Sequence, residues 1–174
     1  MKTSEFLSQL DKVDRMGIWA LSMANLRVMF PESPKTFMKG LGRMLAQGLL
    51  VRICNGLYVN PRASCKPADM LATTASFLRP WDFNYLSLES ALAEAGRISQ
   101  LPSRMTLMTT GRKGIFETPY GVIEFVHTQR KPNEILKEVY FDPQRELYVA
   151  TPERATRDLR RAGRNIHLIQ HEDV

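Results

Sequence analysis

The sequence predicts an α+β protein made of two domains, and three observations support this prediction. An amphipathic helix followed at once by a tight hairpin occupies Ser33 to Val59. A segment with two prolines and small polar residues, 60–67, interrupts the pattern after that hairpin. Beyond it, short threonine-rich and apolar segments alternate with helical ones, which is typical of a mixed sheet. We therefore expect one domain over residues 1–60 and a mixed α/β domain over residues 61–174.

The segment that begins at Ser33 has the features of a capped amphipathic helix. Ser33 can cap the first free amides, and Pro34 stands where a missing N–H does no harm. At 100° per residue, five apolar side chains fall within one arc of about 120°. They are Phe37, Met38, Leu41, Met44 and Leu45. The opposite face carries Lys35, Thr36, Lys39 and Arg43, so one face suits a protein core and the other an anion.

A hairpin is predicted directly after this helix. Gly48 is placed to end the helix in a left-handed conformation, and residues 49–54 continue as a strand. Asn55-Gly56 suits the two positive φ values of a type I′ turn, so residues 57–59 should pair antiparallel with that strand. Arg52 would lie on this hairpin, within reach of a phosphate.

Two earlier helices are expected, one from Thr3 or Ser4 to near Gly17 and one over about residues 19–30. Three helices followed by a hairpin in about 60 residues are typical of a winged helix-turn-helix domain, which places its last helix in the major groove of DNA. A solvated basic helix surface is the simpler interpretation of the cations alone. The helix, the turn and the hairpin together favour double-stranded DNA as the partner.

The composition indicates a soluble globular protein with excess positive charge in its first part. The chain has 174 residues and a formal net charge of +6, and residues 1–60 hold 8 Lys/Arg against 4 Asp/Glu. This excess suits a phosphate-binding surface. No apolar run approaches the roughly 18 residues that cross a bilayer, and no apolar core of a signal peptide follows the first residues. We therefore expect a cytoplasmic protein without a membrane partner, in which Cys54 and Cys65 are structural or incidental.

The second half is expected to alternate helices and strands. Helices are predicted over 68–78, from Leu88 after a cap at Ser87 to Gly96, and from Pro152 to Ala162 after a cap at Thr151. Strands are predicted at 105–110, 115–117, 122–128, 139–141 and 147–150, with a short one at 166–169.

The last of these helices carries arginines at a spacing that places them on one face: Arg154, Arg157, Arg161 and Arg164. The simpler interpretation is a surface helix made soluble by arginine. Because arginine rather than lysine is favoured at interfaces and on phosphate, a contact with an acidic partner or a second DNA contact is the alternative.

Few groups could carry catalysis or hold a metal or cofactor, and we predict that the protein is not an enzyme. Glu124 and His127 are three residues apart in a predicted strand, so their side chains point to opposite faces. His167 and His171 would lack a third metal ligand. We therefore expect no catalytic residues, no metal and no cofactor.

Three segments of the second half carry a resemblance when taken together. They are Tyr85-Leu86-Ser87-Leu88-Glu89-Ser90-Ala91-Leu92, the hairpin with Tyr120-Gly121 and Phe125-Val126-His127, and Ala150-Thr151-Pro152-Glu153-Arg154-Ala155-Thr156-Arg157-Asp158. With Asn55-Gly56-Leu57-Tyr58 before them, they resemble the AbiEi family, antitoxins of type IV toxin-antitoxin systems first described in phage abortive infection.

The resemblance implies a transcriptional repressor that binds repeats in its own promoter and so autoregulates its operon. It also implies a C-terminal domain that counteracts a nucleotidyltransferase-like toxin encoded beside it. Many family members continue with further helices, whereas this sequence ends at Val174, so we expect a shortened antitoxin half. Two alternatives stay open, an interaction module that neutralises a partner and binds nucleic acid only weakly, and a nucleic-acid-processing enzyme.

Overall fold

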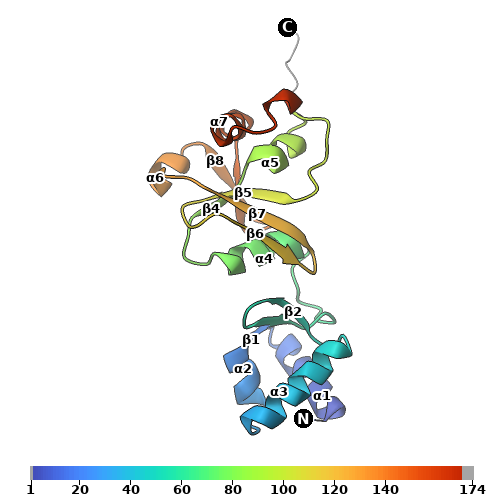
Figure 1. The fold of residues 1–174 in the computed structure, drawn as a ribbon. Coiled ribbons are helices and arrows are strands. Elements are labelled where there is room, and N and C mark those ends of the chain that lie inside the picture. The colour runs from blue at the N-terminus through green and yellow to red at the C-terminus, as the bar shows by residue number, and fades with distance from the viewer. Residues whose placement is uncertain (1, 170–174) are drawn as a thin grey trace. The chain divides into compact units, whose positions relative to one another are not determined.

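The protein has an α+β fold with two β-sheets, as Figure 1 shows. A computed structural model describes residues 2–169. The chain divides into two compact units, Met1–Pro67 and Ala68–Val174, here called unit 1 and unit 2. No helix in the described part of the chain is long and apolar enough to span a membrane.

Unit 1 combines three helices with a three-stranded sheet. Its elements are α1 (Thr3–Arg15), β1 (Ala20–Ser22), α2 (Met23–Met29), α3 (Pro34–Ala46), β2 (Val51–Cys54) and β3 (Leu57–Val59). The strands lie in the order β1-β3-β2, and both pairs are antiparallel. The core is formed by fully buried side chains from all three helices, among them Phe6, Leu26 and Phe37. The rings of Phe6 and Phe30 stack with centroids 5.3 Å apart.

The second helix begins later than the sequence predicts. Residues 20–22, expected to be helical, form strand β1 and pair with β3, and α2 starts at Met23. The cause is a capping box at Ser22: its hydroxyl accepts a hydrogen bond from the Asn25 amide (3.1 Å), and Asn25 Oδ1 accepts one from the Ser22 amide (2.9 Å). Two amides at the helix start are satisfied in this way, which sets the first turn.

The predicted hairpin is present, but its turn is not of type I′. Gly56 has a φ of 75°, whereas Asn55 is not in the left-handed region, as a type I′ turn would require. The register shifts between Arg52 and Cys54, where Ile53 is an extra residue on β2. Ile53 is buried, so the bulge lets its side chain reach the core and changes the turn that closes the hairpin.

Replacing Gly56 by valine is expected to destabilise unit 1 by about 1–2 kcal/mol, because a β-branched side chain disfavours a left-handed backbone. Gly56→Asn, whose side chain tolerates this conformation, should be milder. Thermal unfolding followed by circular dichroism measures both. Equal unfolding temperatures for the wild type and Gly56→Val would show that the turn has another conformation.

Unit 1 extends past residue 60, where the sequence analysis places the boundary, because residues 64 and 65 are bonded to α1. Asp14 accepts hydrogen bonds from the Ser64 amide (3.0 Å) and the Ser64 hydroxyl (3.0 Å). Hydrogen bonds from the Cys65 side chain and the Ser64 backbone lower the pKa of Asp14 to about 2. The segment 61–67, predicted to open the second domain, therefore belongs to unit 1.

Because the folded pKa of Asp14 lies below its usual value, this carboxylate stabilises unit 1 fully above about pH 4. The contribution should be lost as the pH falls from about 4 through about 2. We expect Asp14→Asn to lower the unfolding temperature at pH 7 and to lose this part of the acid dependence. An unfolding temperature equal to that of the wild type at both pH 7 and pH 3 would contradict the role of Asp14.

Unit 2 is built on a six-stranded mixed sheet in the order β6-β7-β5-β4-β9-β8. Its elements are α4 (Met70–Leu78), β4 (Asn84–Leu86), α5 (Leu88–Glu94), β5 (Met105–Thr109), β6 (Gly114–Thr118), β7 (Gly121–His127), α6 (Pro132–Ile135), β8 (Val139–Asp142), β9 (Leu147–Ala150), α7 (Pro152–Ala162) and a 3-10 helix, η1 (Ile166–Leu168). The β4–β9 and β5–β7 pairs are parallel, and the other three pairs are antiparallel. Helices α5 and α7 lie on one side of this sheet and α4 on the other (Figure 1).

Two predictions for unit 2 are wrong. Residues 166–168 form η1 instead of a strand, and Asn165, with a left-handed φ of 54°, precedes this turn. The side chain of Ser87 does not cap α5. Its hydroxyl donates to Asp158 Oδ2 at 2.8 Å instead, because the two side chains are buried together between the sheet and α7. The short helix α6 was not predicted.

Candidate nucleic-acid interface

Helix α3 has one buried face and one exposed face, as its periodicity predicts. The Ser33 hydroxyl accepts a hydrogen bond from the Thr36 amide (3.4 Å), and Pro34 is the first helical residue. Phe37 and Met44 are fully buried, and the guanidinium of Arg27 lies over the Phe37 ring, 5.2 Å from its centroid. The core contacts of α3 therefore determine which of its side chains face solvent.

The four polar residues predicted on the outer face of α3 are all exposed: Lys35, Thr36, Lys39 and Arg43. Within residues 2–169, neither Lys35 nor Lys39 has an ion-pair or hydrogen-bond partner. Met38 was assigned to the apolar arc, but 52% of its surface is exposed. It lies at the edge of that arc, and α1, α2 and the sheet leave it uncovered. The outer face of α3 is therefore a cluster of cations with one apolar side chain beside it.

The hairpin adds an arginine whose guanidinium is held in place. Arg52 is exposed on β2, as the sequence suggests. Its Nε donates to the Cys54 carbonyl oxygen at 3.3 Å, and one terminal nitrogen donates to Asn55 Oδ1 at 2.5 Å. Because a guanidinium has five N–H donors, these two bonds orient the group and leave others for a ligand. Arg52 can thus present N–H donors to an oxyanion.

The formal net positive charge of the protein comes entirely from unit 1. Residues 1–67 contain ten Lys/Arg and four Asp/Glu, whereas residues 68–174 contain fourteen of each. The carboxylate of Asp14 is already bonded to the backbone and side chain of Ser64. Such a separation of charge favours an anionic partner for unit 1 and gives unit 2 no comparable attraction.

The arginines of the last helix do not form one exposed face, contrary to the sequence-based expectation. Arg154 is completely buried and Arg164 is partly buried. Arg164 donates to Glu124 (2.5 Å) and to Glu89 (3.0 Å), and Arg157 donates to Glu138 (2.5 Å). Arg154 is buried because it lies next to the side of α7 that faces the sheet. Arg164 lies beyond the end of α7, so it does not share a helix face with the others.

Arg161 is the one member of this predicted group that is exposed and has no partner among the described residues. A shared contact of all four arginines with a toxin or with DNA is therefore ruled out by the burial of Arg154. Arg157 and Arg161 are still accessible.

A buried polar network joins residues that carry the family resemblance. Asp158 Oδ2 accepts hydrogen bonds from the Tyr85 hydroxyl (3.0 Å), the Ser87 hydroxyl (2.8 Å) and Arg154 Nε (3.1 Å). A terminal nitrogen of Arg154 also bonds to Asp158 Oδ1, and the other donates to Glu138 at 3.0 Å. Burial, and the nearby Asp158 charge, raise the pKa of Tyr85. These residues tie α7 to β4, so their role here is structural.

Sequence reasoning missed this network. The i, i+4 spacing of Arg154 and Asp158 was a signal for an ion pair, but nothing local indicated that it would be buried. Its other donors, Tyr85 and Ser87, are more than 70 residues away in the chain.

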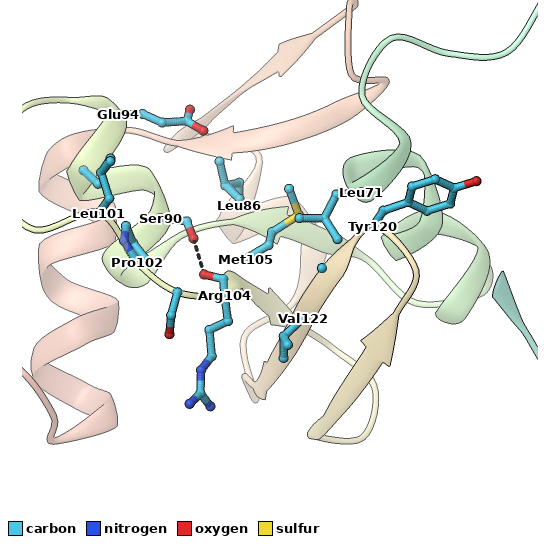
Figure 2. A pocket seen from close by; sticks show the side chains of 13 residues that line it. Leu71, Leu86, Ser90, Glu94, Leu101, Pro102, Arg104, Met105, Tyr120 and Val122 are labelled. Atoms are coloured by element: carbon cyan, nitrogen blue, oxygen red, sulfur yellow. Dashed lines mark hydrogen bonds between the residues drawn. The ribbon is translucent and has the colours of Figure 1, made fainter. Parts of the chain in front are cut away.

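Unit 2 contains a pocket of about 420 Å³. Figure 2 shows the side chains that line it. Its wall is mainly apolar and includes Leu71, Leu86, Leu101, Pro102, Met105, Tyr120 and Val122. At one side the Ser90 hydroxyl donates to the carbonyl oxygen of Arg104 at 3.3 Å. The lining contains no histidine or cysteine. The pocket suits an apolar group.

The histidines considered as candidates have separate environments. His127 Nδ1 lies 2.7 Å from the Gly111 carbonyl oxygen, whereas Glu124 accepts from Arg104 and Arg164. His167 is exposed on η1, and His171 lies outside the described residues. In the part of the chain that the structure describes, no three His, Cys, Asp or Glu side chains are grouped to hold a metal ion.

No protein-family model and no curated protein sequence matches this chain. The features that bear on function are the cations of α3, the oriented Arg52 and the charge difference between the two units.

Proposed function

We propose that the protein is a DNA-binding transcriptional repressor that autoregulates its operon, with unit 1 acting as a winged helix-turn-helix domain. The observation that carries the proposal is the outer face of α3, where Lys35 and Lys39 are exposed and without partners in the described residues. Helices α2 and α3 are joined by a short turn, and the β2–β3 hairpin follows them. This is the order of elements in a winged helix-turn-helix domain.

In this proposal α3 enters the major groove with its cationic face. A helix with side chains is about 10–12 Å across and the groove is about 12 Å wide, so the exposed side chains reach both the base edges and the phosphates. Lys35 and Lys39 neutralise phosphates, Arg43 reads a base edge, and Arg52 on the hairpin donates to a further phosphate. Thr36 is exposed in the first turn of α3, and its hydroxyl donates a hydrogen bond to the DNA.

We further propose that unit 2 acts as an antitoxin against a nucleotidyltransferase-like toxin. The support is the resemblance to the AbiEi family. The segments of this chain that carry the resemblance contain Tyr85, Ser87, Arg154 and Asp158, which form the buried network of unit 2. The alternative, an interaction module that binds nucleic acid only weakly, is favoured by the absence of formal net charge in unit 2 and by its apolar pocket.

The test of DNA binding is fluorescence anisotropy of the full chain with duplex DNA from directly upstream of its own gene, at 50 mM and 200 mM salt. Counterion release predicts that log K falls with log salt by about 0.9 for each phosphate neutralised. We expect tighter binding to this duplex than to a random duplex of equal length. No binding at 50 mM salt would refute the repressor function.

The test of antitoxin activity is rescue of cells that express a nucleotidyltransferase-like protein encoded beside this gene. Two forms should be compared, the wild type and the Lys39→Ala, Arg43→Ala double variant. Rescue by both would place neutralisation outside unit 1's cationic face and support a separate role for unit 2. Rescue by neither would leave the protein a regulator without antitoxin activity.

A further inference from the structure

Gly42 lies on the exposed face of α3, although the fold does not require glycine there. Its φ is not positive, in contrast to Gly48 (66°) and Gly56 (75°), so other residues can adopt its backbone conformation. A Cβ atom built at Gly42 meets nothing within 4 Å. Glycine inside a helix is also less favourable than alanine, because it loses more backbone freedom on folding. Unit 1 would therefore be more stable with alanine at this position.

Gly42 lies at the edge of the proposed DNA-binding face, where that face meets Met38. Lys39 precedes Gly42 by three residues and Met38 by four, so both are its neighbours on the helix surface. Both side chains are exposed. The missing side chain thus leaves helix backbone uncovered between a long positively charged group and an apolar one.

We propose that Gly42 determines how closely α3 approaches DNA. A helix nearly fills the major groove, so a side chain on the surface that enters the groove limits the depth of entry. Without one, the backbone at Gly42 can contact the DNA while Lys39 and Arg43, which lie on one side of it, extend to the phosphates and bases. Glycine can also admit a helix from a protein partner, but Lys39 beside it and the other cations of the same face favour a polyanion. This inference rests on the proposed function.

The test is the substitution of Gly42 by alanine and by leucine in the full chain. Both residues are better helix formers, so the unfolding temperature of each variant should rise by roughly 2–6 °C. Affinity for the upstream duplex should fall by about tenfold for Gly42→Ala, which corresponds to the loss of one good base contact, and further for Gly42→Leu. Stability and affinity thus change in opposite directions, which a folding defect would not produce.

Ser8→Ala is the matched control. Ser8 is exposed in α1, and alanine there also improves helix propensity within unit 1. It should raise the unfolding temperature slightly and leave DNA affinity unchanged. If both Gly42 variants bind the upstream duplex as tightly as the wild type, the inference is overturned while the proposed function stands. If the wild type itself does not bind, both are overturned.

Discussion

Replacing Lys39 and Arg43 by alanine is expected to abolish most of the specific affinity for upstream DNA. Loss of a base-reading arginine removes roughly 1–3 kcal/mol at particular base pairs, and loss of a phosphate-binding lysine reduces the salt slope by about one. Both side chains are exposed on the same face of α3. Anisotropy titrations of each single variant and of the double variant, at two salt concentrations, separate the two effects.

Matched controls are available in unit 2. Lys113 and Arg161 are exposed and have no partner among residues 2–169, so Lys113→Ala and Arg161→Ala remove the same charges elsewhere. They should leave specific affinity nearly unchanged. Thermal unfolding of all four variants should agree with the wild type within a few degrees. If the α3 variants bind as well as these controls, the cationic face of α3 is not the DNA-binding surface.

Removing Asp158 is expected to have the largest effect on stability. Asp158→Ala leaves the guanidinium of Arg154 buried with only Glu138 as a charge partner, and leaves two hydroxyl donors without their acceptor. Breaking a buried ion pair on one side typically destabilises a protein by about 3–5 kcal/mol. Urea unfolding followed by circular dichroism should show a lower midpoint for the transition of unit 2.

Two further variants test whether the loss of stability comes from the buried network. Arg160→Ala removes an exposed arginine from the same helix and should shift stability by no more than about 0.5 kcal/mol. Arg154→Met removes the buried cation while it keeps a long apolar side chain, and Asp158 retains the donors Tyr85 and Ser87. It should therefore be less harmful than Asp158→Ala. An Asp158→Ala midpoint equal to that of Arg160→Ala would show that the network does not stabilise unit 2.

Local signals in the sequence predicted the elements that depend on neighbouring residues. Ser33-Pro34 at the start of α3, Gly48 after it and Thr151-Pro152 at the start of α7 are all capping or helix-initiating positions in the structure. The periodicity of α3 also predicted which of its polar side chains are exposed, because a helix with one buried face leaves the opposite face to solvent. The candidate site on α3 follows from these signals alone.

Elements that depend on distant residues were predicted poorly. Strand β1 has only three residues and exists because Ala20, Leu21 and Ser22 pair with β3, which lies more than 30 residues later. The arginines of α7 have one spacing but different environments, since Arg154 meets Asp158 and Tyr85 in the interior while Arg161 faces solvent. Helical spacing shows which residues are neighbours on a helix, but not which neighbours the sheet will cover.

The sequence by itself determined the α+β class, the limits of α3 and α7, the β2–β3 hairpin and the exposed cations of α3. These depend on capping, helical period and turn residues, whose interactions span only a few positions. The tertiary structure alone decided that residues 61–67 belong to unit 1, through Asp14, and that Ser87 bonds to Asp158 instead of capping α5. Ser87 bonds to Asp158 because both side chains are buried, and a buried carboxylate must be hydrogen-bonded. Asp14 is not buried, but its hydrogen bonds to Ser64 connect residues 50 positions apart in the chain, which no local signal indicates.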